Sequence, residues 1–144
     1  MPTTPSTADR PFVFRLGWGV TLLYAAGLLT FNHLPPEDVP RPRAATLPHF
    51  DKLVHLAGYA GLALLVFGLG LPTCRVAVRW AALAVLLALA ALDELTQPLT
   101  DRNAELLDWA ADALGLLGGF GLAALLRRGA RTGSGASEPP PCDL

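Results

Sequence analysis

Residues 76–97 have the sequence VAVRWAALAVLLALAALDELTQ, and this stretch decides the fold class. After Arg79 it contains no charged residue until Asp93, which a helix from Val76 reaches after about 25 Å. A transmembrane helix needs about 20 apolar residues to cross about 30 Å of hydrocarbon. Because the segment Trp80–Leu92 has no polar face, a soluble helical bundle is a poor alternative. The stretch therefore predicts a membrane-spanning helix.

Three further stretches share this apolar character. They are Leu16–Phe31, Leu53–Leu71 and Leu106–Leu126. Prolines lie in the gaps between them, and a proline cannot continue the helical hydrogen-bond ladder. Hydrophobic residues make up 52% of the chain and charged residues 16%, where an average globular chain has about 25% charged. We predict an all-α fold, a four-helix transmembrane bundle, in a multi-pass protein of the cell membrane.

The two ends of the chain differ from this membrane domain. Residues 129–144 are rich in Gly, Ser and Pro and have no apolar period, which is typical of a disordered tail. We predict disordered tails over residues 1–11 and 129–144, with one membrane domain over residues 12–128 between them.

The charge balance excludes one class of partner. The chain has 11 basic and 12 acidic residues, whereas binding to nucleic-acid phosphates requires a basic surplus. No nucleic-acid partner is therefore expected.

Serine-nucleophile chemistry is also excluded, because the serines are confined to the tails, at Ser6, Ser134 and Ser137.

The distribution of arginine and lysine residues predicts the orientation in the membrane. On one side lie Arg10, Arg15, Arg75, Arg79, Arg127, Arg128 and Arg131. On the other side lie Arg41, Arg43, Lys52 and Arg102. Because the side richer in basic residues stays in the cytoplasm, both termini are predicted to be cytoplasmic.

Under this topology, polar side chains from three spans meet near the outer membrane surface. They are Asp51, His55 and Tyr59 at the start of the second span, Asp93, Glu94 and Gln97 at the end of the third, Arg102 in the turn that follows, and Asp108 and Asp112 at the start of the fourth. Ionisable residues inside a span are rare and usually functional. The sequence therefore predicts one shared site in this layer.

A stripe of small residues continues below the two acids of the fourth span. Its members, Ala111, Gly115, Gly119 and Ala123, recur every four residues. Small residues at this spacing let helix backbones approach closely in lipid. We expect the stripe to face the bundle, and Asp108 and Asp112 to point inward with it.

The polar layer resembles the VanZ-like family of small bacterial membrane proteins. The likeness is carried by the ordered blocks Asp51-Lys52-x-x-His55-x-x-x-Tyr59, Asp93-Glu94-x-x-Gln97, Arg102 and Asp108-x-x-x-Asp112-x-x-Gly115-x-x-x-Gly119. It covers about Leu16 to Leu126, and it departs from the family where Asn is common and this chain has Asp112. The resemblance implies a role in the cell envelope, because the founding member is associated with resistance to teicoplanin-type glycopeptide antibiotics.

Two function classes fit these residues. The first is a non-catalytic protein that binds or shields an anionic lipid-linked head group, such as that of a cell-wall precursor, and alters antibiotic susceptibility. Its ligand-binding residues would be Arg102, Gln97, Tyr59, Asp51, Asp108 and Asp112. The alternative is an intramembrane enzyme that modifies a lipid head group, with His55 as base and Glu94 or Asp93 as acid. Either protein could function as a homodimer.

Structural roles and a metal site are further alternatives. A structural role, in which ionisable groups near helix ends pair with one another and acids stabilise the helix dipole, is the favoured interpretation for Asp51, Lys52 and Glu105 taken alone. Arg102 can simply neutralise Asp108 or Asp93. An imidazole with carboxylates can hold a divalent cation, but one histidine without thiolates disfavours zinc. We therefore predict no metal and no cofactor.

Overall fold

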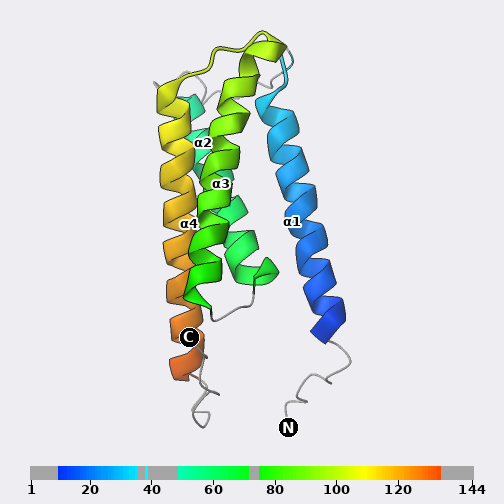
Figure 1. Cartoon of the computed structure of the whole chain (residues 1–144), viewed down its shortest axis with the longest axis vertical. Coiled ribbons are helices and arrows are strands. Elements are labelled where there is room, and N and C mark those ends of the chain that lie inside the picture. Colours follow the sequence, from blue (N-terminus) through cyan, green and yellow to red (C-terminus); the bar gives the residue numbers. More distant parts are fainter. Residues whose placement is uncertain (1–9, 36–37, 39–48, 72–74, 134–144) are drawn as a thin grey trace.

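The computed structural model describes residues 10–35, 38, 49–71 and 75–133 (Figure 1). The helices are α1 (Arg10–Asn32), α2 (Phe50–Leu65), α3 (Val76–Thr96) and α4 (Leu106–Gly133). A π-helical turn, η3 (Val66–Gly70), extends α2, and a 3₁₀ turn, η4 (Gln97–Thr100), extends α3. The described part of the chain contains no strand, so the all-α prediction is confirmed.

All four helices are long enough and apolar enough to cross a membrane. The spans are Phe14–Asn32, Phe50–Leu69, Val76–Thr100 and Leu106–Gly129. Leucines cover much of the outer surface, for example Leu23 at 77% and Leu106 at 78% exposure. In water so broad an apolar surface would associate, whereas lipid hydrocarbon accepts it. The helices therefore indicate a multi-pass membrane protein, as predicted.

Both predicted domain boundaries fall inside helices. The first helix begins at Arg10, within the predicted tail 1–11, and the last continues to Gly133, past the predicted limit at residue 128. Extending a helix that is already formed costs little, because each added residue gains one backbone hydrogen bond. The predicted disorder of residues 1–9 and 134–144 lies outside the described residues.

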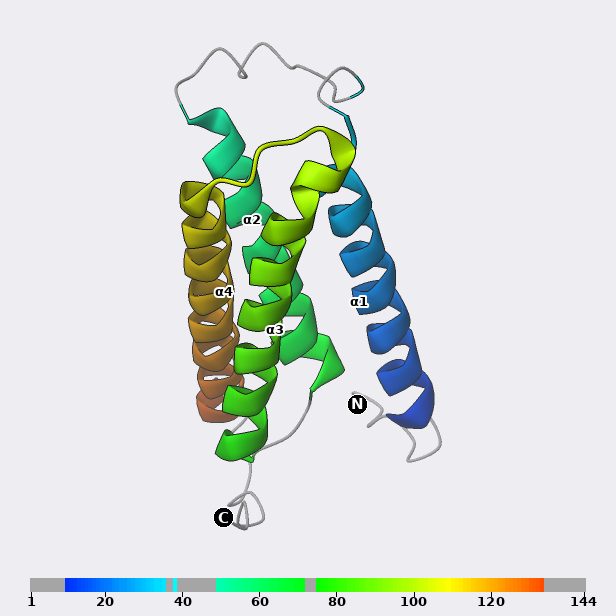
Figure 2. The same cartoon turned by 45° about the horizontal axis from the view of Figure 1, so that its top comes forward.

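The helices alternate in direction along the chain (Figures 1 and 2). As a result α2 and α4 run parallel to each other, and α1 and α3 run opposite to them. The most extensive packing joins α2 to α4, while α1 lies against α2 and η3, and α3 lies against α4. The end of α1, the start of α2, the end of α3 and the start of α4 therefore meet at one end of the bundle, here called the polar end.

Two glycines hold α2 and α4 together at short range. A Cβ atom at Gly115 would collide with the carbonyl oxygen of Leu56, and one at Gly119 with the carbonyl oxygen of Ala60. The two alanines of the small-residue stripe are buried as well. The stripe thus faces the bundle, as predicted. The small size of its residues lets the two helix backbones approach closely.

The opposite end of this helix pair is joined by Arg127. Its Nη2 atom donates to the carbonyl oxygen of Leu71 at 2.9 Å and to that of Phe67. The last carbonyls of a helix have no partner within the helix, and an unsatisfied carbonyl is costly in lipid. The guanidinium therefore satisfies the carboxyl end of the second span and fastens α4 to it.

Adding a methyl group to the glycine contact is expected to destabilise the fold. Gly115→Ala and Gly119→Ala should each lower the free energy of unfolding by about 1–3 kcal/mol, because the backbones must move apart. The matched control is Gly118→Ala, since a Cβ there meets nothing within 4 Å. Reversible unfolding with SDS in mixed micelles measures these values, and equal stability of all three variants would contradict the packing.

Candidate functional site

The structure gathers most of the predicted site residues at the polar end of the bundle. Those with buried side chains are His55 and Tyr59 on α2, Asp93 and Glu94 on α3, Gln97 in η4, and Asp108 and Asp112 on α4. Buried polar groups need hydrogen-bond partners, and lipid supplies none. These side chains therefore depend on one another, and they divide into three groups.

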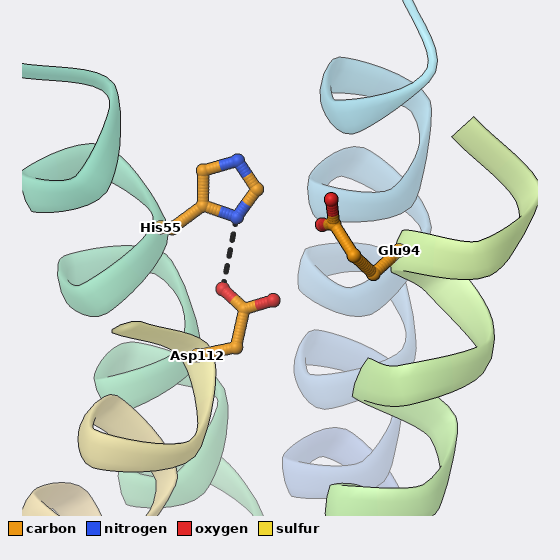
Figure 3. Close-up of side chains that lie close together, drawn as sticks. All are labelled: His55, Glu94 and Asp112. Carbon is orange, nitrogen blue, oxygen red and sulfur yellow. Dashed lines mark hydrogen bonds and ion pairs between the residues drawn. The ribbon is translucent and has the colours of Figure 1, made fainter. Parts of the chain in front are cut away.

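The first group is centred on His55 and Asp112 (Figure 3). Nδ1 of His55 lies 2.9 Å from Oδ1 of Asp112. Glu94 faces this pair from α3, held by Nε2 of Gln97 at 2.9 Å and by the backbone N–H of Glu105 at 2.5 Å. A fixed carboxylate opposite a histidine and aspartate pair can exchange a proton with it or share a cation.

The second group surrounds Asp93 and connects α1 to α2 and α3. Oδ2 of Asp93 accepts hydrogen bonds from Nδ2 of Asn32 and from the hydroxyl of Tyr59, both at 2.7 Å. Nδ1 of His33 lies 3.4 Å from Oδ1 of Asp93, and Nε2 of His33 lies 3.1 Å from Oγ1 of Thr96. Oδ2 of Asp93 thus has two hydrogen-bond donors, and of the two predicted acids Glu94 is the one that faces His55.

The third group has Lys52 at its centre. Its Nζ atom lies 2.7 Å from Asp51 Oδ2, 2.5 Å from Glu105 Oε2 and 2.7 Å from Asp108 Oδ1. The Lys52 side chain is only 16% exposed. The sequence suggested a structural role for this lysine, and in the structure it is the cation that three acids share.

Asp51 and Arg102 stay outside the buried part of the layer. Asp51 is exposed. Each step of four residues along a helix adds a rotation of about 40°, so Asp51 lies about 80° around α2 from Tyr59. Nη1 of Arg102 donates to the carbonyl oxygen of Leu34 at 3.4 Å. Within the described residues Arg102 forms no ion pair, since Lys52 neutralises Asp108 instead.

Three residues of the layer are absent from the sequence prediction: Asn32, His33 and Thr96. Asn32 and His33 directly follow the first apolar run, and a polar pair at the predicted outer end of a span is a signal that would have found them. Thr96 carries no such signal, because threonine in a helix often bonds to its own backbone, as this one does to Leu92.

An apolar cavity of about 510 Å³ leads to the layer from the hydrocarbon side. It lies between α1 and α3 with α2 behind it, and Ala25, Leu62 and Leu89 are among its lining residues. Its polar end contains the second group, including His33 and Asp93. From Trp18 to His33 it follows α1 over about 22 Å.

Removing the shared cation should destabilise the bundle. Lys52→Met is expected to cost about 1–3 kcal/mol, because the buried Asp108 would lose its charged partner. Asp108→Asn in the same background should recover part of this loss, and a double-mutant cycle in SDS unfolding measures the coupling. The control is Arg15→Met, an exposed cation on α1. If Lys52→Met and Arg15→Met lower the free energy of unfolding by the same amount, Lys52 does not hold the acids together.

In comparisons with protein-family models, with curated proteins and with solved structures, no match to this chain was found.

Proposed function

We propose that this chain is a cell-membrane protein that binds a lipid or a lipid-linked cell-wall precursor. The cavity between α1 and α3 carries the proposal. It is apolar along its length and ends at polar side chains, which matches the order of hydrocarbon and head group in an amphiphile. Its length of about 22 Å exceeds half of the roughly 30 Å hydrocarbon core, so a chain from one leaflet fits along it.

Two sequence features support a ligand in the outer leaflet. The arginine distribution favours cytoplasmic termini, and with that orientation the polar end would lie at the outer surface. The blocks around His55, Glu94 and Asp112 resemble those of the VanZ-like family, which supports a role in the envelope and an effect on glycopeptide susceptibility. Lipid-linked cell-wall precursors expose anionic head groups at that surface.

Arg102 is the residue that best fits an anionic head group. It is half-buried beside the end of α1, and its guanidinium forms no ion pair within the described part of the chain. A planar guanidinium binds phosphate or carboxylate through two parallel hydrogen bonds. We therefore assign it to the head group, with the cavity holding the hydrocarbon.

The alternative function is an intramembrane enzyme, and one observation favours it. His55 is hydrogen-bonded to Asp112 and faces Glu94, so a base oriented by one carboxylate stands opposite a second. This arrangement fits general acid-base chemistry on a head group, with His55 as base and Glu94 as acid.

Filling the cavity is expected to displace the ligand. We expect lipid to co-purify with the wild-type chain and to fall several-fold in Ala25→Phe, because the ring would occupy the hydrocarbon site. The control is Ala26→Phe, since Ala26 is exposed and does not line the cavity. Mass spectrometry of lipids extracted from the purified proteins measures the difference. Equal lipid content in both variants would refute the proposed site.

The same lipid extracts separate binding from catalysis. An enzyme would produce a lipid of new mass in cells that express the wild-type chain but not in cells with His55→Ala and Glu94→Gln. Unchanged lipid masses, together with protection from a glycopeptide antibiotic, would exclude the enzyme and leave the binding protein.

The membrane orientation is tested by thiol labelling of intact cells. In a background with Cys74→Ser and Cys142→Ser, Asp101→Cys is expected to react with a membrane-impermeant maleimide. Arg75→Cys, at the other end of α3, is expected to react only after the cells are opened. The reverse pattern would place the polar end in the cytoplasm and contradict an outer-leaflet ligand.

A further inference from the structure

His55, Glu94 and Asp112 form a compact set of metal-ligand types (Figure 3). They come from α2, α3 and α4, and one possible ligand atom from each lies within 4.8 Å of the others. All three side chains are buried. An imidazole nitrogen with two carboxylate oxygens is a donor set that divalent cations accept in proteins.

Asp112 supplies a second, independent observation. The residue is 0% exposed, and within the described residues its Oδ2 atom has no hydrogen-bond partner. Figure 3 shows the carboxylate oxygen that does not contact His55 directed toward the side of Glu94. Because a buried charged acceptor without a partner costs free energy, a positive group between Asp112 and Glu94 would stabilise the site.

The neighbouring acids show how such a cluster is neutralised by the chain itself. Asp51, Glu105 and Asp108 also have metal-ligand spacing, and Nζ of Lys52 lies between them. Around His55, Glu94 and Asp112 no lysine or arginine takes this position in the part of the chain that the structure describes. A divalent cation would supply there the charge that Lys52 supplies next to it.

We propose that His55, Glu94 and Asp112 bind one divalent metal ion. The 2.9 Å hydrogen bond between His55 Nδ1 and Asp112 Oδ1 orients both side chains, and Oδ2 of Asp112 stays available to the ion. Octahedral sites with mainly oxygen ligands suit Mn²⁺, whereas Zn²⁺ prefers tetrahedral sites. Gln97 and the N–H of Glu105 hold Glu94 in place for this role.

The donor set of this site suits a cation that prefers oxygen ligands. A single histidine without thiolates disfavoured zinc, but it does not disfavour a cation that prefers oxygen. Three protein ligands also leave octahedral positions open, and a bound cation would attract a phosphate oxygen to this acid-rich layer. That contact with a head group rests on the proposed function, whereas binding of the metal does not.

The test uses the full-length chain in detergent, stripped of metal with a chelator and without added lipid. Titration with Mn²⁺, followed by electron paramagnetic resonance, is expected to show one bound ion per chain. Glu94→Gln and Asp112→Asn should weaken binding about tenfold or more, because each removes one charged ligand. The matched control is Asp51→Asn, which removes an exposed acid from the other cluster and should leave the affinity unchanged.

A spectroscopic signature protects the test against variants that fail to fold. In the wild-type chain, electron spin-echo modulation should show a coupled imidazole nitrogen, because the Asp51, Glu105 and Asp108 cluster contains no histidine. Three results would each overturn the metal site. They are no Mn²⁺ binding at millimolar concentration, no coupling to an imidazole nitrogen, or a loss of Mn²⁺ affinity in Asp51→Asn equal to that in Glu94→Gln and Asp112→Asn. Loss of lipid in the Ala25→Phe experiment is a separate readout, so the two proposals can fail independently.

Discussion

The backbone contact between α2 and α4 controls the geometry of the polar end. Gly115 and Gly119 let the two helices touch, and because the helices run parallel the contact sets their register. This register places Asp112, one turn before Gly115, beside His55. In lipid there is no hydrophobic force between helices, so such close packing, together with polar contacts, holds the pair together. A larger residue at either glycine would separate the helices and with them the two side chains.

The three polar groups at this end differ in the partners that the chain supplies to their acids. Oδ2 of Asp93 accepts hydrogen bonds from α1 and α2, His33 lies 3.4 Å from Oδ1 of Asp93, and Lys52 neutralises the acids at the starts of α2 and α4. Both groups thus serve to join helices. The group of His55, Glu94 and Asp112 keeps a buried carboxylate oxygen without a partner among the described residues. Because no lysine or arginine in the described residues neutralises this first group, it is the one at which we propose cation binding or acid-base chemistry.

Much of the fold and part of the site were predictable from sequence. The spans follow from uninterrupted apolar runs, and the depth of each polar residue follows from its position along a span. The sequence does not show which of these side chains contact one another. Asp93 and Glu94 are neighbours in sequence, yet a rotation of about 100° per residue directs one to α1 and the other to His55. Their roles depend on which helices lie on each side of α3, which no local pattern contains.

The sequence by itself determined that the chain is helical, that it has four apolar spans and that its acids gather at one end. It did so because hydrocarbon forces backbone groups to pair within each helix, so local composition decides the structure. Only the tertiary structure decided that Lys52 is shared by three acids, that a cavity separates α1 from α3, and that Asp112 faces Glu94. These features depend on helix register and neighbour choice, which arise from contacts between residues far apart in the chain.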